Sequence, residues 1–88
     1  MDHIFSVEIV TPLKAIRQAE IVSIVVPAES GYLGVLANHA PLITNLVPGK
    51  IFLRDSGNKR TTFYSSGKGF LHVLKNSVTL ILDSINES

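Results

Sequence analysis

Strand-forming residues recur in short stretches along this sequence, and this pattern constrains the fold more than any other feature. In residues 3–10, apolar Phe5, Val7 and Ile9 alternate with polar Ser6 and Glu8, which gives an extended strand one apolar face. Further stretches of β-branched, aromatic or alternating residues lie at 21–26, 51–54, 61–66, 70–74 and 78–82. Seven or more short strands predict an all-β sandwich or barrel.

Turn-forming residues between these stretches predict how the strands connect. Residues 55–58 (Asp-Ser-Gly-Asn) and 75–77 (Lys-Asn-Ser) each lie between two strand signals, so each is expected to form a hairpin tip. The Pro48-Gly49 pair predicts a further turn. Pro27 is expected to end its strand, because proline has no N–H to donate to a sheet ladder.

Two segments lack a clear strand pattern. Thr11-Pro12 could begin a helix, but the apolar stripe that would follow is thin. We therefore interpret residues 11–20 as a turn followed by a short edge strand. Residues 84–88 lose the alternation, which predicts a frayed tail.

Composition limits the size and the class of the protein. A chain of 88 residues predicts one domain, spanning residues 1–88. Eight Lys and Arg against seven Asp and Glu give no electrostatic basis for binding nucleic acid. Cysteine is absent, which excludes disulfides and thiolate metal sites. The apolar runs are far shorter than the roughly 20 residues that span a bilayer, so no direct membrane insertion is expected.

The segment from Gly31 to Thr44, GYLGVLANHAPLIT, combines apolar residues with glycine and proline, which bend the chain. Gly31 and Gly34 could adopt positive φ or lie close to a partner, and Pro41 fixes its backbone. This composition suits neither a buried strand nor an ordinary polar surface. It predicts a surface loop that another molecule recognises.

The same segment resembles the signature of the epsilon subunit of rotary F-type ATP synthase, which is called delta in mitochondria. The matching pattern is G-x-L-G-V-L-x-N-H-A-P-L-I-T. Four further stretches are similar to that family, at residues 7–12, 22–27, 48–51 and 66–70. The chain differs from many relatives at Tyr32, where they have an acidic residue, and at Lys68, which interrupts a common Gly-Gly pair.

The resemblance implies a β-sandwich of two roughly five-stranded sheets with about ten short strands. It further implies a non-catalytic rotor subunit of the proton-translocating enzyme, without a cofactor, that couples ion-driven rotation to ATP synthesis. Such a subunit would bind the gamma subunit and the polar loops of the c-ring and would meet the rest of F1 indirectly. Its implied place is peripheral, at the cytoplasmic face of the cell (inner) membrane. The family usually continues into a C-terminal helical hairpin, which is not expected in a chain that ends at Ser88.

The resemblance also assigns roles to individual residues. The implied c-ring interface comprises Ser30, Gly31, Tyr32 and Leu33. The implied gamma interface comprises His39, Ala40, Pro41, Leu42 and Thr44. With Tyr32 in place of an acid, the c-ring contact is expected to be apolar or hydrogen-bonded rather than an ion pair.

Other interpretations of the same residues stay open. His39 could serve a pocket of a stand-alone ligand-binding or enzymatic β-sandwich, and the apolar surplus could instead be buried in a homodimer. His3, His39 and His72 lack metal-ligand spacing, so no metal site is expected. Gly67-Lys68-Gly69 is too short for a phosphate loop and predicts a turn or bulge.

The inward or outward orientation of several apolar residues is also open from the sequence. Tyr32 and Leu33 suit either the core or the surface. Val22, Val25 and Phe52 fall on an outward face by alternation, unless an irregular strand turns them inward.

Overall fold

The computed structural model describes residues 3–87, which form nine strands and no helix. The strands are β1 (Phe5–Val10), β2 (Ala15–Ala28), β3 (Gly31–Leu36), β4 (Leu42–Leu46), β5 (Gly49–Asp55), β6 (Arg60–Ser65), β7 (Gly69–Leu74), β8 (Ser77–Leu82) and β9 (Asn86–Glu87). The all-β prediction is confirmed, and both hairpin tips lie where the turn residues predict them. Within residues 3–87, nothing in the fold provides a helix that could cross a membrane.

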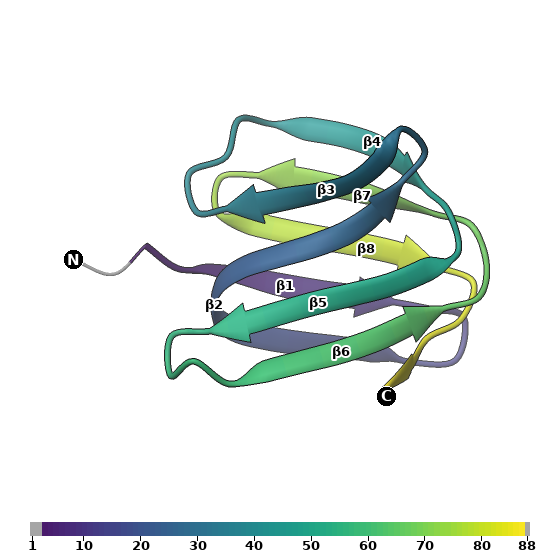
Figure 1. Ribbon diagram of the computed structural model, residues 1–88, viewed down its shortest axis with the longest axis horizontal. Helices are drawn as coiled ribbons and strands as arrows, with labels where there is room; N and C mark the ends of the chain where they lie inside the picture. Colours follow the sequence, from purple (N-terminus) through teal and green to yellow (C-terminus); the bar gives the residue numbers. More distant parts are fainter. Residues whose placement is uncertain (1–2, 88) are drawn as a thin grey trace.

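The strands form two packed layers that share β2. In sheet I, the first part of β2 is followed in order by β1, β8, β7 and β4. In sheet II, β3 is followed by the second part of β2, then β5, β6 and β9. Figure 1 shows β3, β5 and β6 in front of β1, β7 and β8. Each sheet has five strands, because β2 contributes to both, so the nine strands confirm the prediction of two five-stranded sheets.

Hydrogen bonding continues from one sheet to the other at both of their common borders. β2 passes through one border, and a bridge between Ala28 and Leu46 connects β2 with β4 at the other. All pairings are antiparallel except that of β1 with β8, which is parallel. This closure connects the two layers covalently and by hydrogen bonds, so shearing one layer over the other would break ladder bonds.

The predicted turn and edge strand over residues 11–20 are present, with the strand at an edge of sheet I beside β1. The strand is not short as predicted, because it is the first part of the 14-residue β2. Thr11 Oγ1 accepts hydrogen bonds from the N–H groups of Leu13 and Lys14, which forms a turn in place of a helix. β2 then changes direction at Glu20, whose φ is +57°. The backbone N–H of Ser56 donates to Glu20 O at 2.9 Å and stabilises this unusual conformation.

Pro27 does not end its strand, contrary to the prediction. Its carbonyl accepts a hydrogen bond from Val47 N, and in an extended strand the N–H and C=O of one residue point to the same side. The missing N–H therefore points away from β3. On that side the ladder between β2 and β5 has already ended at the Val25–Phe52 pair, so proline removes no bond from it.

The core lies between the sheets and is built from the alternating inward residues. Phe5, Val7 and Ile9 are buried, as the alternation predicts. The other buried apolar residues are Ile21, Ile24, Val26, Ala28, Val35, Leu46, Ile51, Leu53, Phe63, Leu71, Val73, Val78, Leu80, Leu82 and Ile85. These side chains come from all strands except β9, so the two sheets pack on one continuous core.

The described part of the tail is ordered, so the prediction of fraying fails for residues 84–87. Ile85 is buried in the core, and Asn86 and Glu87 pair with β6. The hydroxyl groups of Ser84 and Ser66 lie 2.6 Å apart. Ser88 lies outside the described residues.

Candidate protein-binding surfaces

The segment 31–44 is two strands joined by a turn, so the prediction of a surface loop is wrong for most of it. Among residues 3–87, β3 pairs with β2 alone and forms an edge of sheet II, while β4 pairs with β7 in sheet I. Gly31 is the first residue of β3 after the turn. Its φ is +127°, a backbone conformation that residues with a side chain rarely adopt. A Cβ at Gly34 would meet no atom within 4 Å. An edge strand accommodates these glycines where a central strand would lose packing.

The turn residues of the two groups that the resemblance singles out lie at opposite ends of the sandwich, while Leu42 and Thr44 lie along β4 between these ends. Ser30 and Gly31 lie at the turn from β2 to β3, whereas residues 39–41 follow β3 at its far end. Figure 1 shows these turns at the right and at the left of the molecule. The six residues of β3 separate them by about 20 Å, at ~3.3 Å per residue. One sequence motif therefore provides two separate surfaces.

Tyr32 is exposed and lies along the outer face of sheet II. Its side chain is 61% exposed, its Oη accepts a long hydrogen bond of 3.4 Å from Lys50 N, and its ring lies 6.4 Å from that of Phe52. Gly49 leaves room for this arrangement, since a Cβ there would lie 3.2 Å from Tyr32 Oη and 2.9 Å from the Cβ of Pro27. Leu33, in contrast, is partly buried against the core.

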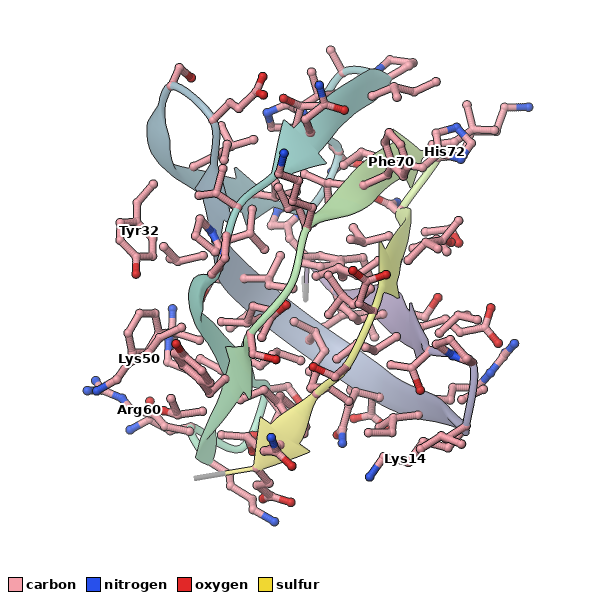
Figure 2. All side chains as sticks on the ribbon, turned by 90° about the vertical axis from the view of Figure 1, so that its right-hand side faces the viewer. Lys14, Tyr32, Lys50, Arg60, Phe70 and His72 are labelled. Carbon is pink, nitrogen blue, oxygen red and sulfur yellow. The ribbon has the colours of Figure 1, made fainter. Side chains whose placement is uncertain are left out.

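The outer face of sheet II is aromatic and basic. Figure 2 shows Tyr32, Lys50 and Arg60 on one side of the molecule. Arg54 pairs directly with Arg60 across β5 and β6, so both point outward. The remaining outward apolar residues are Val25 and Phe52, which pair with each other, and Leu36 and Tyr64. Val22, at a register irregularity between Ile21 and Ser23, is half-buried.

The turn after β3 presents the imidazole of His39. Its Nδ1 lies 2.8 Å from Ala40 O, and since a carbonyl oxygen only accepts hydrogen bonds, Nδ1 must carry the proton. In the neutral ring Nε2 is then an acceptor that a partner can use. His39 is half-buried, while Ala40 and Pro41 are exposed.

β4 alternates between the core and the surface. Leu42 and Thr44, which the resemblance assigns to the gamma interface, are partly buried, and Leu42 packs on the core. Ile43 between them is 71% exposed. The register of β4 with β7 sets this orientation, because Leu42 and Thr44 pair with the buried residues Val73 and Leu71.

Ile43 belongs to an exposed apolar patch on the outer face of sheet I that the sequence interpretation missed. We call it the sheet I patch, and its members are Ile43, Phe70, His72, Leu74 and Ile81. Figure 2 shows Phe70 and His72 on the side of the molecule opposite Tyr32. β7 is apolar at inward positions (Leu71, Val73) and also at outward positions (Phe70, Leu74). This pattern in the sequence indicates a strand that is buried on both faces.

The geometry around His39 gives little support to a ligand pocket. A hollow of about 460 Å³ lies at this end of the sandwich, but His3, Val22, Leu36, Ala37 and Asn38 line it, without His39. Within residues 3–87, no three His, Cys, Asp or Glu side chains are grouped so that they could hold a metal ion. The exposed apolar residues described above lie on the outer faces of the two sheets, which suits recognition of another protein.

Comparison with known proteins identifies related chains. Residues 4–88 match the family model described as "ATP synthase, Delta/Epsilon chain, beta-sandwich domain". The ATP synthase epsilon chain of Dichelobacter nodosus is 43% identical over 79 residues, which are 90% of this chain and 54% of that protein. The epsilon chain of Chloroflexus aggregans is 40% identical over 81 residues, 92% of this chain and 57% of that protein. The chain thus spans little more than half the length of these relatives.

Two solved structures have the same fold. A chain in the mitochondrial ATP synthase of Euglena gracilis, in a structure of OSCP, F1 and the c-ring, aligns with a TM-score of 0.87 and 24% identity. That alignment covers 99% of this chain and 54% of the other. A chain in the central stalk and c-ring of the Tetrahymena thermophila mitochondrial enzyme aligns with a TM-score of 0.80 and 17% identity. This alignment covers 93% of the present chain and 65% of the other.

Proposed function

The chain belongs to the ATP synthase delta/epsilon chain family, whose β-sandwich domain it carries, and from this premise we propose that it is a non-catalytic rotor subunit of the central stalk. In this role it binds the gamma subunit and the polar loops of the c-ring and transmits rotation between them. It is a peripheral component at the cytoplasmic face of an energy-coupling membrane. The observation that carries the proposal is the pair of exposed surfaces at separate places on one closed sandwich.

The gamma subunit is assigned to the end that carries residues 39–41 and to the adjoining sheet I patch. Ile43 connects the two, since it follows the turn and pairs with His72. An apolar centre bordered by hydrogen-bonding groups is the usual composition of a stable protein interface. Leu42 contributes indirectly by packing β4 on the core, and Thr44 is partly buried beside it and pairs with Leu71.

The c-ring is assigned to the opposite end, at Ser30, Gly31, Tyr32 and Leu33. Gly31 and the exposed Ser30 allow backbone to approach closely. Tyr32 offers a large, exposed ring that lies beside Phe52 and accepts a hydrogen bond from Lys50 N. An aromatic side chain offers a large contact area to a partner and a hydroxyl group that can form a hydrogen bond.

The closed sandwich suits the transmission of torque between these two ends. The two sheets enclose a single core and are joined through β2 and through the Ala28–Leu46 bridge. Close-packed interiors have low compressibility and transmit strain. A force applied at the turn before β3 would therefore reach the turn after β3 with little deformation between them.

Coexpression with the gamma subunit tests the proposed function. A stoichiometric complex is expected to survive size-exclusion chromatography, whereas the chain alone elutes as its own species. Absence of a complex, with both proteins folded, would contradict the proposal. A saturable effect of small ligands on the His39 resonances, without any gamma binding, would favour a ligand-binding module.

Tyr32→Ala is expected to weaken capture of the chain by detergent-solubilised c-rings by about 5- to 10-fold, because a buried aromatic anchor typically contributes more than 1 kcal/mol. Binding to gamma should stay within about twofold of the parent. Leu36→Ala is the matched control, because Leu36 lies on the same strand and face with 63% exposure, but at the other end of β3. Pull-downs that show a loss of gamma binding, with c-ring capture intact, would remove this assignment.

A further inference from the structure

The turn between β3 and β4 is tied to a turn that is distant in the sequence. Asn38 N donates to Asn76 Oδ1 at 2.6 Å, and Asn76 Nδ2 donates to Asn38 Oδ1 at 3.2 Å. The two residues are 38 positions apart, and Asn76 lies in the hairpin turn between β7 and β8. We call this pair of bonds the asparagine clasp.

Both residues of the clasp adopt the left-handed conformation, with φ of +63° at Asn38 and +59° at Asn76. Asparagine tolerates this region better than most residues with a side chain. Glycine would tolerate it too, but it has no side chain that could form either bond. Asparagine therefore satisfies the backbone and connects the two turns at once.

Asn76 is itself anchored to a third segment. Its carbonyl accepts a hydrogen bond of 3.1 Å from Ser6 N, at the start of β1. The clasp thus connects the turn after β3 with the β7–β8 hairpin turn and, through Asn76 O, with β1. The other hydrogen bond described in that turn, from His39 Nδ1 to Ala40 O, stays within it.

We propose that Asn76 is a positioning residue for partner binding, which holds residues 37–41 in the shape that the gamma subunit recognises. The inference rests on the proposed function, because it concerns the affinity of that same surface. An ordered turn loses less conformational entropy on docking than a free one. Asn76 increases affinity in this way without contacting the partner.

Asn76→Gly tests the inference, because glycine keeps the positive φ and removes both side-chain bonds. The net contribution of one or two neutral hydrogen bonds corresponds to a factor of about 3 to 10. The Asn38 amide should exchange its hydrogen faster by this factor in the free chain, and the Kd for gamma should rise by a similar factor. Lys75→Gly is the matched control, because Lys75 has a φ of +49° in the same turn and takes no part in the clasp. It should change neither quantity by more than about twofold.

Asn76→Asp separates the two bonds. The carboxylate can still accept from Asn38 N but cannot donate to Asn38 Oδ1. Protection of the Asn38 amide should therefore be largely retained in Asn76→Asp and lost in Asn76→Gly, which a general loosening of the hairpin would not produce.

The possible outcomes separate this inference from the proposed function. If the parent binds gamma and Asn76→Gly binds equally well, Asn76 does not position the surface and the inference is overturned. If Lys75→Gly weakens binding as much as Asn76→Gly, the effect belongs to the hairpin backbone, which also overturns it. If the parent does not bind gamma, the proposed function fails, and the inference fails with it even where the Asn38 amide is protected.

Discussion

Gly69→Ala is expected to lower the free energy of unfolding by about 3 kcal/mol, a large share of the stability of a small domain. Gly69 is buried at the start of β7, between Leu46 of β4 and Leu82 of β8. An added Cβ would collide with the carbonyl oxygen of Ile81 and would lie 2.6 Å from Leu82 Cδ2. The carbonyl is backbone, so it can yield only if β7 and β8 separate. Overpacking of this kind typically costs about 1–3 kcal/mol, occasionally more.

Urea denaturation measures this effect, and Gly34→Ala provides the control. A Cβ at Gly34 would meet nothing within 4 Å, and the residue is not among those with positive φ. The free energy of unfolding of Gly34→Ala should stay within about 0.5 kcal/mol of that of the parent. Any gain would arise from the lower conformational entropy of the unfolded chain. For a chain of this size, the Gly69→Ala change corresponds to a fall in Tm of roughly 12–24 °C. Equal stability of the two variants would mean that β7 and β8 do not pack as described.

Ile43→Glu is expected to weaken binding to the gamma subunit by about 30-fold or more. Ile43 is 71% exposed in the free chain, so a carboxylate there remains hydrated and should cost less than about 1 kcal/mol of stability. In a complex that buries the sheet I patch, the same carboxylate would lose its water without gaining a described partner. A penalty of 2 kcal/mol or more is typical at the centre of an interface, which is about 30-fold in Kd.

Leu13→Glu is the control for this prediction. Leu13 is 94% exposed in the turn between β1 and β2, which lies at the other end of the sandwich from residues 39–41. The two substitutions therefore make the same charge change at exposed aliphatic residues, and Leu13→Glu should bind gamma within about twofold of the parent. Isothermal titration of purified gamma with each variant gives both values. If Ile43→Glu binds as tightly as Leu13→Glu, the sheet I patch is not part of the gamma interface.

The strands and hairpins could be predicted from the sequence because their signals are local. Alternation over residues 3–10 places Phe5, Val7 and Ile9 in the core, and the tips at residues 55–58 and 75–77 follow from their turn-forming residues. The bend at Gly67, between β6 and β7, is local as well. Each of these features depends on neighbours a few positions away in the chain.

The features that the sequence interpretation missed depend on distant contacts. The change of direction in β2 places Glu20 in the left-handed region and relies on Ser56, 36 residues away. Ile85 is the one apolar residue in its stretch, and only its place beside the core makes it buried. Pro27 is compatible with a strand because of where β5 stops pairing, which no local pattern shows.

The candidate surfaces could be predicted only in part. The segment 31–44 is correctly singled out as rich in exposed apolar residues, among them Tyr32, Leu36 and Ile43. Which of its residues point outward depends on the registers of β3 with β2 and of β4 with β7, which assign Leu42 and Thr44 to the inside. The sheet I patch takes its other members from β7 and β8, so it exists only after long-range pairing.

Amide hydrogen exchange of the chain bound to the gamma subunit measures most directly which face meets this partner. The proposed function predicts slowed exchange in residues 37–44 and in the sheet I strands β7 and β8, while residues 30–33 exchange as in the free chain. Protection confined to the face that carries Tyr32, Lys50 and Arg60, with β4 and β7 unchanged, would contradict it.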